Sequence, residues 1–297
     1  MSKAIKAAIL LLVLGIMAVC PFGVKAETVL HTERSLYRNI IVYESDDERC
    51  MRFTKQISAR QSCISLKDPD SLVFNYTKMM LGALYLQPGP DKVLIIGLGG
   101  GILTSTLARI LPKAKIDTVE IDPAVVRVAQ KYFNFRMSST MTVAEEDGRV
   151  FVKRAIQKGT KYDLIMLDAF DHEYIPEHLL TQEFLREVKQ IMTPAGVLAA
   201  NTWSSSRLYD HESTTYESVF GRFFNLRLVS RVILVKNDGL SSKSVISKNA
   251  ETLEARLKPF GAGADFLLPL FSTDRDWRTD ARILTDQYSP SNLLNAH

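Results

Sequence analysis

Two carboxylates, Asp168 and Asp171, stand three residues apart directly after residues 162–167, an apolar segment typical of a buried strand. On a loop that leaves such a strand, both side chains can reach the same crevice. Acids that lie close together and are partly desolvated bind protons more tightly, which suits a general base. The pair could also simply cap the loop and the turn that follows. Their chemical role would be to hold a cationic amine and to accept a proton from it.

A glycine-rich turn follows another buried segment, residues 93–96. Glycines let the backbone approach a ligand closely and turn sharply into a helix, whose N-terminus favours anionic or polar groups. Ile102 occupies the position of the last glycine of the dinucleotide fingerprint, so a nicotinamide oxidoreductase is a distant alternative. The glycines concerned are Gly97, Gly99, Gly100 and Gly101.

Two further acids stand at or just after the ends of the next predicted strands, residues 115–121 and 141–144. Glu120 can accept both ribose hydroxyls of an adenosine, and Asp147, which Gly148 follows, can accept from the adenine amino group. Either acid alone could be a solvated residue at a strand end. Because the carboxyl ends of parallel strands meet at one edge of a sheet, the acids and the glycine turn together predict a nucleoside site.

The elements that must position these residues alternate between strand and helix from Lys92 onward. Asp122 followed by Pro123 is typical of a helix start, and Pro194 and Gly196 are expected to stop a helix that begins near Thr181. This alternation predicts an α/β fold with a doubly wound mixed sheet. The predicted strands are residues 93–96, 115–121, 141–144, 162–167, 197–201, 226–236 and 243–247.

Upstream, residues 29–75 read as a small antiparallel sheet and residues 76–86 as a helix.

The chain has 297 residues, of which 46% are hydrophobic and 24% charged, as in an ordinary soluble globular protein. The formal charge of +4 comes from scattered Lys and Arg residues. Without a basic block or a basic-aromatic stripe, the sequence argues against nucleic-acid binding.

The N-terminus carries the pattern of an export signal. Lys3 and Lys6 precede the apolar residues 7–19, and a small residue, Ala26, follows at a plausible cleavage point. A lasting inner-membrane anchor is the second alternative, and the cytoplasm the third. The segment is therefore expected to engage the membrane or the secretion machinery, with the body in the periplasm or outside the cell. The expected division is a signal or anchor over 1–26, a β-domain over 27–76 and a catalytic domain over 77–297.

Cys50 and Cys63 are the cysteines that remain after such cleavage. They could pair in an oxidising compartment, or they could remain reduced, half-buried thiols. No CxxC pair or His/Cys cluster indicates zinc, so we expect no metal.

In the order of its motifs the chain resembles the spermidine synthase (polyamine aminopropyltransferase) family, and more closely its stand-alone or transporter-fused bacterial branch. The resemblance runs from Tyr37 to about Trp203, over half of the chain, and returns in the C-terminal tail. The matching motifs are residues 37–42, Gln61-Ser62, Tyr76, and residues 93–97, 119–122, 147–149, 168–171, 175–179 and 283–290.

The resemblance implies a small N-terminal β-domain on a Rossmann-like domain of the S-adenosylmethionine-dependent methyltransferase type. Asp168 would be the base that activates an amine, and Asp171 would orient that amine. Gln61 and Tyr76 would line its channel. The donor would be bound by the remaining motif residues: Glu120 at the ribose, Asp147 and Gly148 at the adenine, and Gly97, Gly99, Gly100 and Gly101 along the methionine-derived chain.

Three positions depart from the family pattern. Gly100 stands where the family carries an acid that grips the amine end, Thr77 and Lys78 follow the matching tyrosine in place of Gln or His and Glu, and Arg38 replaces a glutamine. A lost charge-assisted hydrogen bond costs roughly 1.5–3 kcal/mol. The amine half of the site is therefore expected to be weakened, with Lys78 as a nearby positive charge, while the nucleoside half is intact.

The leading hypothesis is polyamine biosynthesis: transfer of an aminopropyl group from decarboxylated S-adenosylmethionine to a small amine such as putrescine. The alternatives are an S-adenosylmethionine-dependent methyltransferase and a non-catalytic exported protein that binds a nucleoside or polyamine. His172 and His178 are interpreted as surface residues. The resemblance also allows a homodimer.

Overall fold

The computed structural model describes residues 27–56, 60–169, 176–203 and 207–290. The predicted signal or anchor over 1–26, the site candidate Asp171 and the predicted surface residue His172 lie outside the described residues. Among the described residues, no helix is both long enough and apolar enough to span a bilayer.

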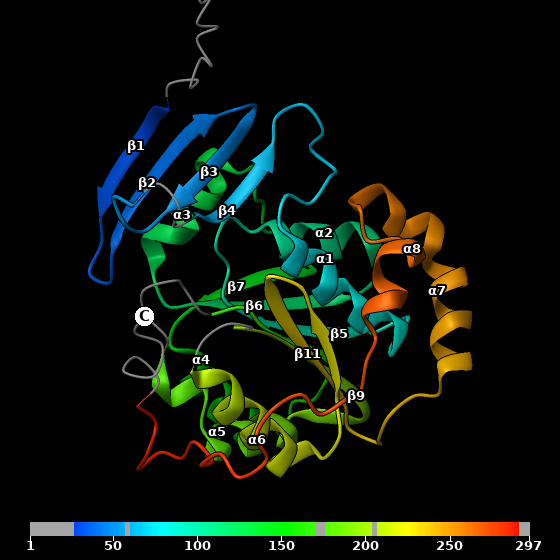
Figure 1. The fold of residues 1–297 in the computed structure, drawn as a ribbon. Helices are drawn as coiled ribbons and strands as arrows, with labels where there is room; N and C mark the ends of the chain where they lie inside the picture. The colour runs from blue at the N-terminus through cyan, green and yellow to red at the C-terminus, as the bar shows by residue number, and fades with distance from the viewer. Residues whose placement is uncertain (1–26, 57–59, 170–175, 204–206, 291–297) are drawn as a thin grey trace, which may run out of the picture.

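The N-terminal part folds as a four-stranded antiparallel meander, which forms the upper layer of the molecule in Figure 1. Asp46 and Asp47, with φ of 49° and 64°, form the tight turn between its second and third strands, a conformation that short polar residues tolerate. The strands, in spatial order, are β1 (Thr28–Arg34), β2 (Asn39–Ser45), β3 (Glu48–Arg52) and β4 (Arg60–Ser65).

A seven-stranded mixed sheet forms the larger part. Its order is β10-β11-β9-β8-β5-β6-β7, with β5 to β9 parallel and β10 and β11 antiparallel, which confirms the predicted α/β fold. The strands are β5 (Lys92–Ile96), β6 (Lys115–Glu120), β7 (Met141–Glu145), β8 (Tyr162–Leu167), β9 (Met192–Trp203), β10 (Phe224–Arg227) and β11 (Ser230–Lys236).

Helices cover both faces of this sheet, as Figure 1 shows. Side chains alternate across a strand, so Val93 and Ile95 of β5 enter one core while Leu94 and Ile96 enter the other. The first core packs against α1 (Asn75–Leu81), α2 (Ile102–Ile110) and α7 (Lys243–Leu257). The second packs against α4 (Gly148–Gln157), α5 (Gln182–Gln190) and α6 (Leu208–Phe220). A 3-10 turn (Gly82–Tyr85) follows α1, and a short helix, α8 (Ala264–Leu267), follows α7.

Helix α3 (Pro123–Tyr132) joins the two parts of the molecule. Ala124, Val125 and Val128 on one side of the helix pack against Ile40 and its neighbours in the small sheet. Asp122 caps this helix as expected, because its carboxylate accepts the Ala124 amide at 2.9 Å. The small sheet is thereby held beside the carboxyl ends of β5 and β6.

Two predictions about elements are wrong. Residues 243–247 form no strand but the first turns of α7, which begins behind the Ser242 side chain as its cap. Strand β9 begins at Met192 and runs through Pro194 and Gly196, which were expected to separate helix from strand. The pairing of β9 with β8 is irregular between Tyr162 and Leu164, and this irregularity accommodates Pro194 and Gly196 within β9.

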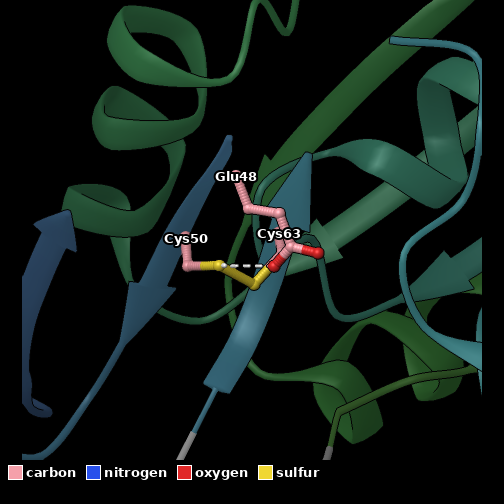
Figure 2. Close-up of side chains that lie close together, drawn as sticks. All are labelled: Glu48, Cys50 and Cys63. Carbon is pink, nitrogen blue, oxygen red and sulfur yellow. Dashed lines mark hydrogen bonds between the residues drawn. A yellow bond between two sulfur atoms is a disulfide. The ribbon is translucent and has the colours of Figure 1, made fainter. Parts of the chain in front are cut away.

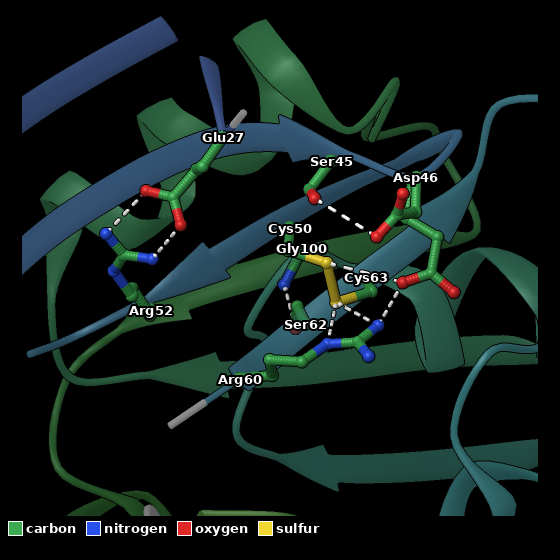
Figure 3. Close-up of a disulfide and its surroundings, with 10 residues drawn as sticks. Glu27, Ser45, Asp46, Cys50, Arg52, Arg60, Ser62, Cys63 and Gly100 are labelled. Atoms are coloured by element: carbon green, nitrogen blue, oxygen red, sulfur yellow. Dashed lines mark hydrogen bonds and ion pairs between the residues drawn. A yellow bond between two sulfur atoms is a disulfide. The ribbon is translucent and has the colours of Figure 1, made fainter. Parts of the chain in front are cut away.

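Cys50 and Cys63 form a disulfide between β3 and β4, so the reduced alternative is wrong for this structure. The two residues are directly opposite each other in the antiparallel register, with Cα atoms 4.1 Å apart. Figure 3 shows the bond and its surroundings.

Candidate active site

A cavity of about 260 Å³ lies where the small sheet faces the carboxyl ends of β5, β6 and β8. It is lined by eight of the predicted site residues: Gln61, Tyr76, Gly97, Gly99, Glu120, Asp147, Gly148 and Asp168. Gly100 and Gly101 do not line it. Residues that come from six separate segments of the chain therefore meet in one crevice, which is where ligands bind in doubly wound sheets.

The glycine turn is shaped by close contacts. A Cβ on Gly97 would lie 2.2 Å from the backbone oxygen of Asp168, and a Cβ on Gly101 would lie 2.5 Å from the Phe135 ring. Both have positive φ, of 103° and 73°. Gly101 stands at the N-cap of α2, so its place in the turn is structural.

Glu120 lies at the end of β6 with its carboxylate in the cavity wall. One oxygen accepts the Leu98 amide and the other accepts the Asp122 amide, each at 3.0 Å. The pKa of Glu120 is raised, because the effect of burial exceeds that of the two hydrogen bonds and the Arg38 charge, which lower it. The carboxylate is thus fixed in orientation, and each oxygen keeps acceptor capacity for a ribose hydroxyl.

Asp147 is engaged on both of its oxygens. Its Oδ1 caps α4 by accepting the Arg149 and Val150 amides at 2.9 and 3.0 Å. Its Oδ2 lies 2.7 Å from Nε2 of His178, whose hydrogen bond lowers the pKa of Asp147. His178 is exposed, as predicted for a surface residue, and it also lines the cavity beside Asp147.

Asp168 is the half-buried acid at the other end of the cavity. Its Oδ1 accepts from Nδ2 of Asn201 at 3.0 Å, and its Oδ2 accepts from the Tyr76 hydroxyl at a long 3.5 Å. Burial raises the pKa of Asp168 to about 7, against these two hydrogen bonds, which lower it. A carboxyl group with a pKa near neutrality is suited to general-base catalysis.

Sequence reasoning missed Asn201 and the role of Ser62. Asn201 stands near the end of β9, so the rule that found the other strand-end residues also applied to it. Ser62 on β4 lines the cavity and accepts the Gly100 amide at 2.9 Å. That contact joins two regions far apart in the sequence, and no local signal marks it.

The structure places two of the residues that depart from the family pattern. Arg38 lines the cavity and stacks on Phe53, 4.3 Å from the ring centroid. Lys78 does not line the cavity, and its ammonium lies 5.8 Å from the ring centroid of Phe266, among residues after α7. The expectation that Lys78 places a positive charge near the amine is wrong.

These features bring eight of the predicted site residues together at one cavity of a Rossmann-like fold. Residues 73–237 match the family model for the spermine/spermidine synthase domain. The chain is 44% identical to a polyamine aminopropyltransferase of Vibrio vulnificus over 292 residues, 96% of this chain and 98% of that relative. It therefore belongs to the spermine/spermidine synthase family and is a transferase.

Two solved structures show the same fold. Spermidine synthase from Thermotoga maritima superimposes with a TM-score of 0.62 at 20% identity, over 83% of this chain and 85% of that one. Human methyltransferase-like protein 13, in complex with SAH, superimposes with a TM-score of 0.56 at 26% identity, over 74% of this chain and 100% of that one. The fold thus serves both aminopropyl-transfer and methyl-transfer proteins, and the choice between them depends on the site.

Proposed function

We propose that this protein transfers an aminopropyl group from decarboxylated S-adenosylmethionine to a small amine such as putrescine. The observation that carries the proposal is Asp168, a half-buried carboxyl group whose pKa is about 7, in the same cavity as Glu120. The spermine/spermidine synthase domain and the Vibrio vulnificus relative support the same activity.

The donor nucleoside fits the Glu120 end of the cavity. Glu120 would accept from the ribose hydroxyls, since backbone amides already fix its orientation. Gly97 and Gly99 line the cavity where the methionine-derived chain would lie, and a side chain at either position would collide with Asp168 or Ser62. Asp147 and Gly148 line the wall where the adenine would lie.

The chemistry is a direct displacement. The amine nitrogen attacks the propyl carbon next to the sulfonium, the carbon–sulfur bond breaks, and its electron pair stays on sulfur to give neutral methylthioadenosine. The nitrogen loses a proton, which the Asp168 carboxylate accepts. The residues of this chain contribute position and deprotonation, which are the main means of accelerating such a step.

The test is incubation of the purified protein with decarboxylated S-adenosylmethionine and a panel of diamines, with methylthioadenosine as the readout. Asp168→Asn should lower release with every amine by at least about a hundredfold. Asp280→Asn is the matched control, since Asp280 is an exposed carboxylate outside the cavity whose side chain is 80% accessible. Absence of methylthioadenosine with all amines would reject the proposal, and tight nucleoside binding without turnover would favour the non-catalytic alternative.

Methyl transfer is the second candidate, favoured by one feature of the glycine turn. A Cβ on Gly100 would lie 3.1 Å from the Phe133 ring and 3.2 Å from Cβ of Ser62. The packing thus leaves little room there for the acid that the family uses at the amine end. Methyltransferase-like protein 13 shares the fold. The product decides: S-adenosylhomocysteine marks methyl transfer and methylthioadenosine marks aminopropyl transfer.

We further propose that the folded body is exported, or anchored to the inner membrane by residues 1–26. The signal-like N-terminus supports this, as does the Cys50–Cys63 disulfide, since disulfides persist in oxidising compartments. Glu27, the first residue after the expected cleavage point, is paired with Arg52 through two hydrogen bonds.

A homodimer also stays a prediction. Light scattering on the purified protein measures its molar mass and so tests this directly.

A further inference from the structure

The disulfide lies one residue away from the donor site. Cys63 follows Ser62 on β4, and consecutive residues of a strand point to opposite faces. Ser62 faces the cavity and holds the Gly100 amide at 2.9 Å, while Cys63 is bonded to Cys50 on β3. Figure 3 shows Gly100, Ser62 and the disulfide together.

Strand β4 has few other constraints on its position. It is the last strand of its sheet, so ladder hydrogen bonds from β3 hold one side of it. On its other side, within the described chain, the pairing is a single bridge between Ile64 and Leu72. The disulfide adds a covalent tether at the centre of this edge strand, beside the residue that contacts the glycine turn.

The disulfide is also connected to Asp168, the proposed base, through a series of side-chain contacts. Phe74 packs against the cluster that contains Cys50 and Cys63, and its ring is stacked on that of Tyr76 with centroids 5.8 Å apart. The Tyr76 hydroxyl donates to Asp168. Cys63 and Asp168 also border the same small cavity, so a shift of β4 would be felt at the base as well as at the glycine turn.

The polar groups around the two sulfurs do not form a metal site. Figure 2 shows Glu48, Cys50 and Cys63 close together. Their possible ligand atoms lie within 4.8 Å of one another, but the sulfurs are bonded to each other and offer no thiolate. Arg60 donates to Sγ of Cys63 at 3.1 and 3.2 Å and pairs with Glu48. The cluster therefore packs around the bond and supports its position.

We propose that the Cys50–Cys63 disulfide is a positioning element of the donor site. It fixes β4 so that Ser62 meets the Gly100 amide and Tyr76, in the first turn of α1, meets Asp168. Reduction removes the tether: dithiothreitol supplies two electrons and two protons, leaves two thiols and becomes a cyclic disulfide. This inference rests on the proposed function only in assigning the cavity to an adenosyl donor.

The experiment is calorimetry of methylthioadenosine binding to the full chain, oxidised and then reduced. Loss of the Ser62 contact predicts binding about twofold to tenfold weaker in the reduced protein. The double variant Cys50→Ala/Cys63→Ala should bind as weakly in either condition. In Ser62→Ala, reduction should cost less than in the wild type, because the contact is already missing. A thiol titration checks that reduction releases two thiols more.

A matched control separates position from stability. Leu253→Ala on α7 removes a buried side chain far from the cavity and destabilises the fold, yet the oxidised variant should bind methylthioadenosine like the wild type. Weaker binding in this control would mean that reduction weakens binding through lost stability, and it would overturn the inference. Equal binding by oxidised and reduced wild type would overturn it while leaving the proposed function intact. No binding in either state would reject both.

Discussion

Removing the Asn201 amide should move the pH dependence of catalysis. Asn201 donates to Oδ1 of Asp168 at 3.0 Å, and this bond favours the ionised form of an acid whose pKa burial raises to about 7. Leucine at this position has nearly the same size but no donor. The variant Asn201→Leu therefore leaves burial in place and removes one of the two hydrogen bonds that oppose it.

The magnitude follows from the strength of the lost bond. A hydrogen bond to a charged group contributes about 1.5–3 kcal/mol, and one pH unit corresponds to about 1.4 kcal/mol, so the pKa of Asp168 should rise by about one to two pH units. A base works only when deprotonated, so the rise of kcat/KM with pH should move upward by the same amount. At neutral pH the rate should fall about fivefold to fiftyfold, and it should recover in alkaline buffer.

The assay is the initial rate of methylthioadenosine release at subsaturating donor, from about pH 5.5 to about pH 9.5. Asn237→Leu is the control, because Asn237 donates to a backbone oxygen outside the cavity and should leave the profile unchanged. A rate that is lower at every pH, with the midpoint unmoved, would refute the reasoning. It would show that Asn201 acts through shape or substrate contact and not through the pKa of Asp168.

Further predictions concern the other site residues and the compartment. Asp168→Asn should lower turnover by at least about a hundredfold while methylthioadenosine still binds, measured by rate and calorimetry. Because folding raises the pKa of Asp168 from 3.8 to about 7, the wild type loses stability as pH rises through that window, and Asp168→Asn should be more stable at pH 8 in urea titrations, by at most about 4 kcal/mol. Glu120→Gln should weaken donor binding about tenfold to a hundredfold, seen as a higher donor KM. Gly100→Asp should lower Tm by several degrees, because the Phe133 ring and Ser62 must move. A C-terminal alkaline phosphatase fusion should be active, and an inactive fusion of normal abundance would reject export.

The positions of the acids could be predicted because one rule governs them. Glu120, Asp147 and Asp168 each stand at or just after the end of a strand with recognisable apolar residues, and the carboxyl ends of parallel strands share an edge. Their partners could not be predicted in this way. His178 reaches Asp147 from a segment far along the chain, and nothing in the local sequence specifies that contact.

The wrong strand over 243–247 shows the limit of a short window. Val245 and Ile246 are β-branched, but Ile246, Ala250, Leu253 and Leu257 are the buried residues of α7 and recur every three or four positions. The helical period appears only over the whole element. The disulfide is a similar case, since the pairing of Cys50 with Cys63 depends on the register between β3 and β4 and not on the spacing of the cysteines.

Fewer carboxylates of the cavity are available to bind an amine than the sequence suggested. Of the carboxylates that line the cavity within the described residues, Glu146 pairs with Arg154. Asp147 is engaged by His178 and the start of α4, and Glu120 accepts two backbone amides.

Asp168 differs from these acids, because among the described residues its Oδ2 has only the long contact with Tyr76. A cation that enters the cavity would therefore meet its most available acceptor at Asp168, the group that we propose as the base. With Lys78 turned toward Phe266, no charge from that side chain opposes the amine. Binding of the acceptor amine and its deprotonation thus depend on the same carboxylate, so Asp168→Asn should raise the amine KM as well as lower kcat, while Glu120→Gln should act on the donor alone.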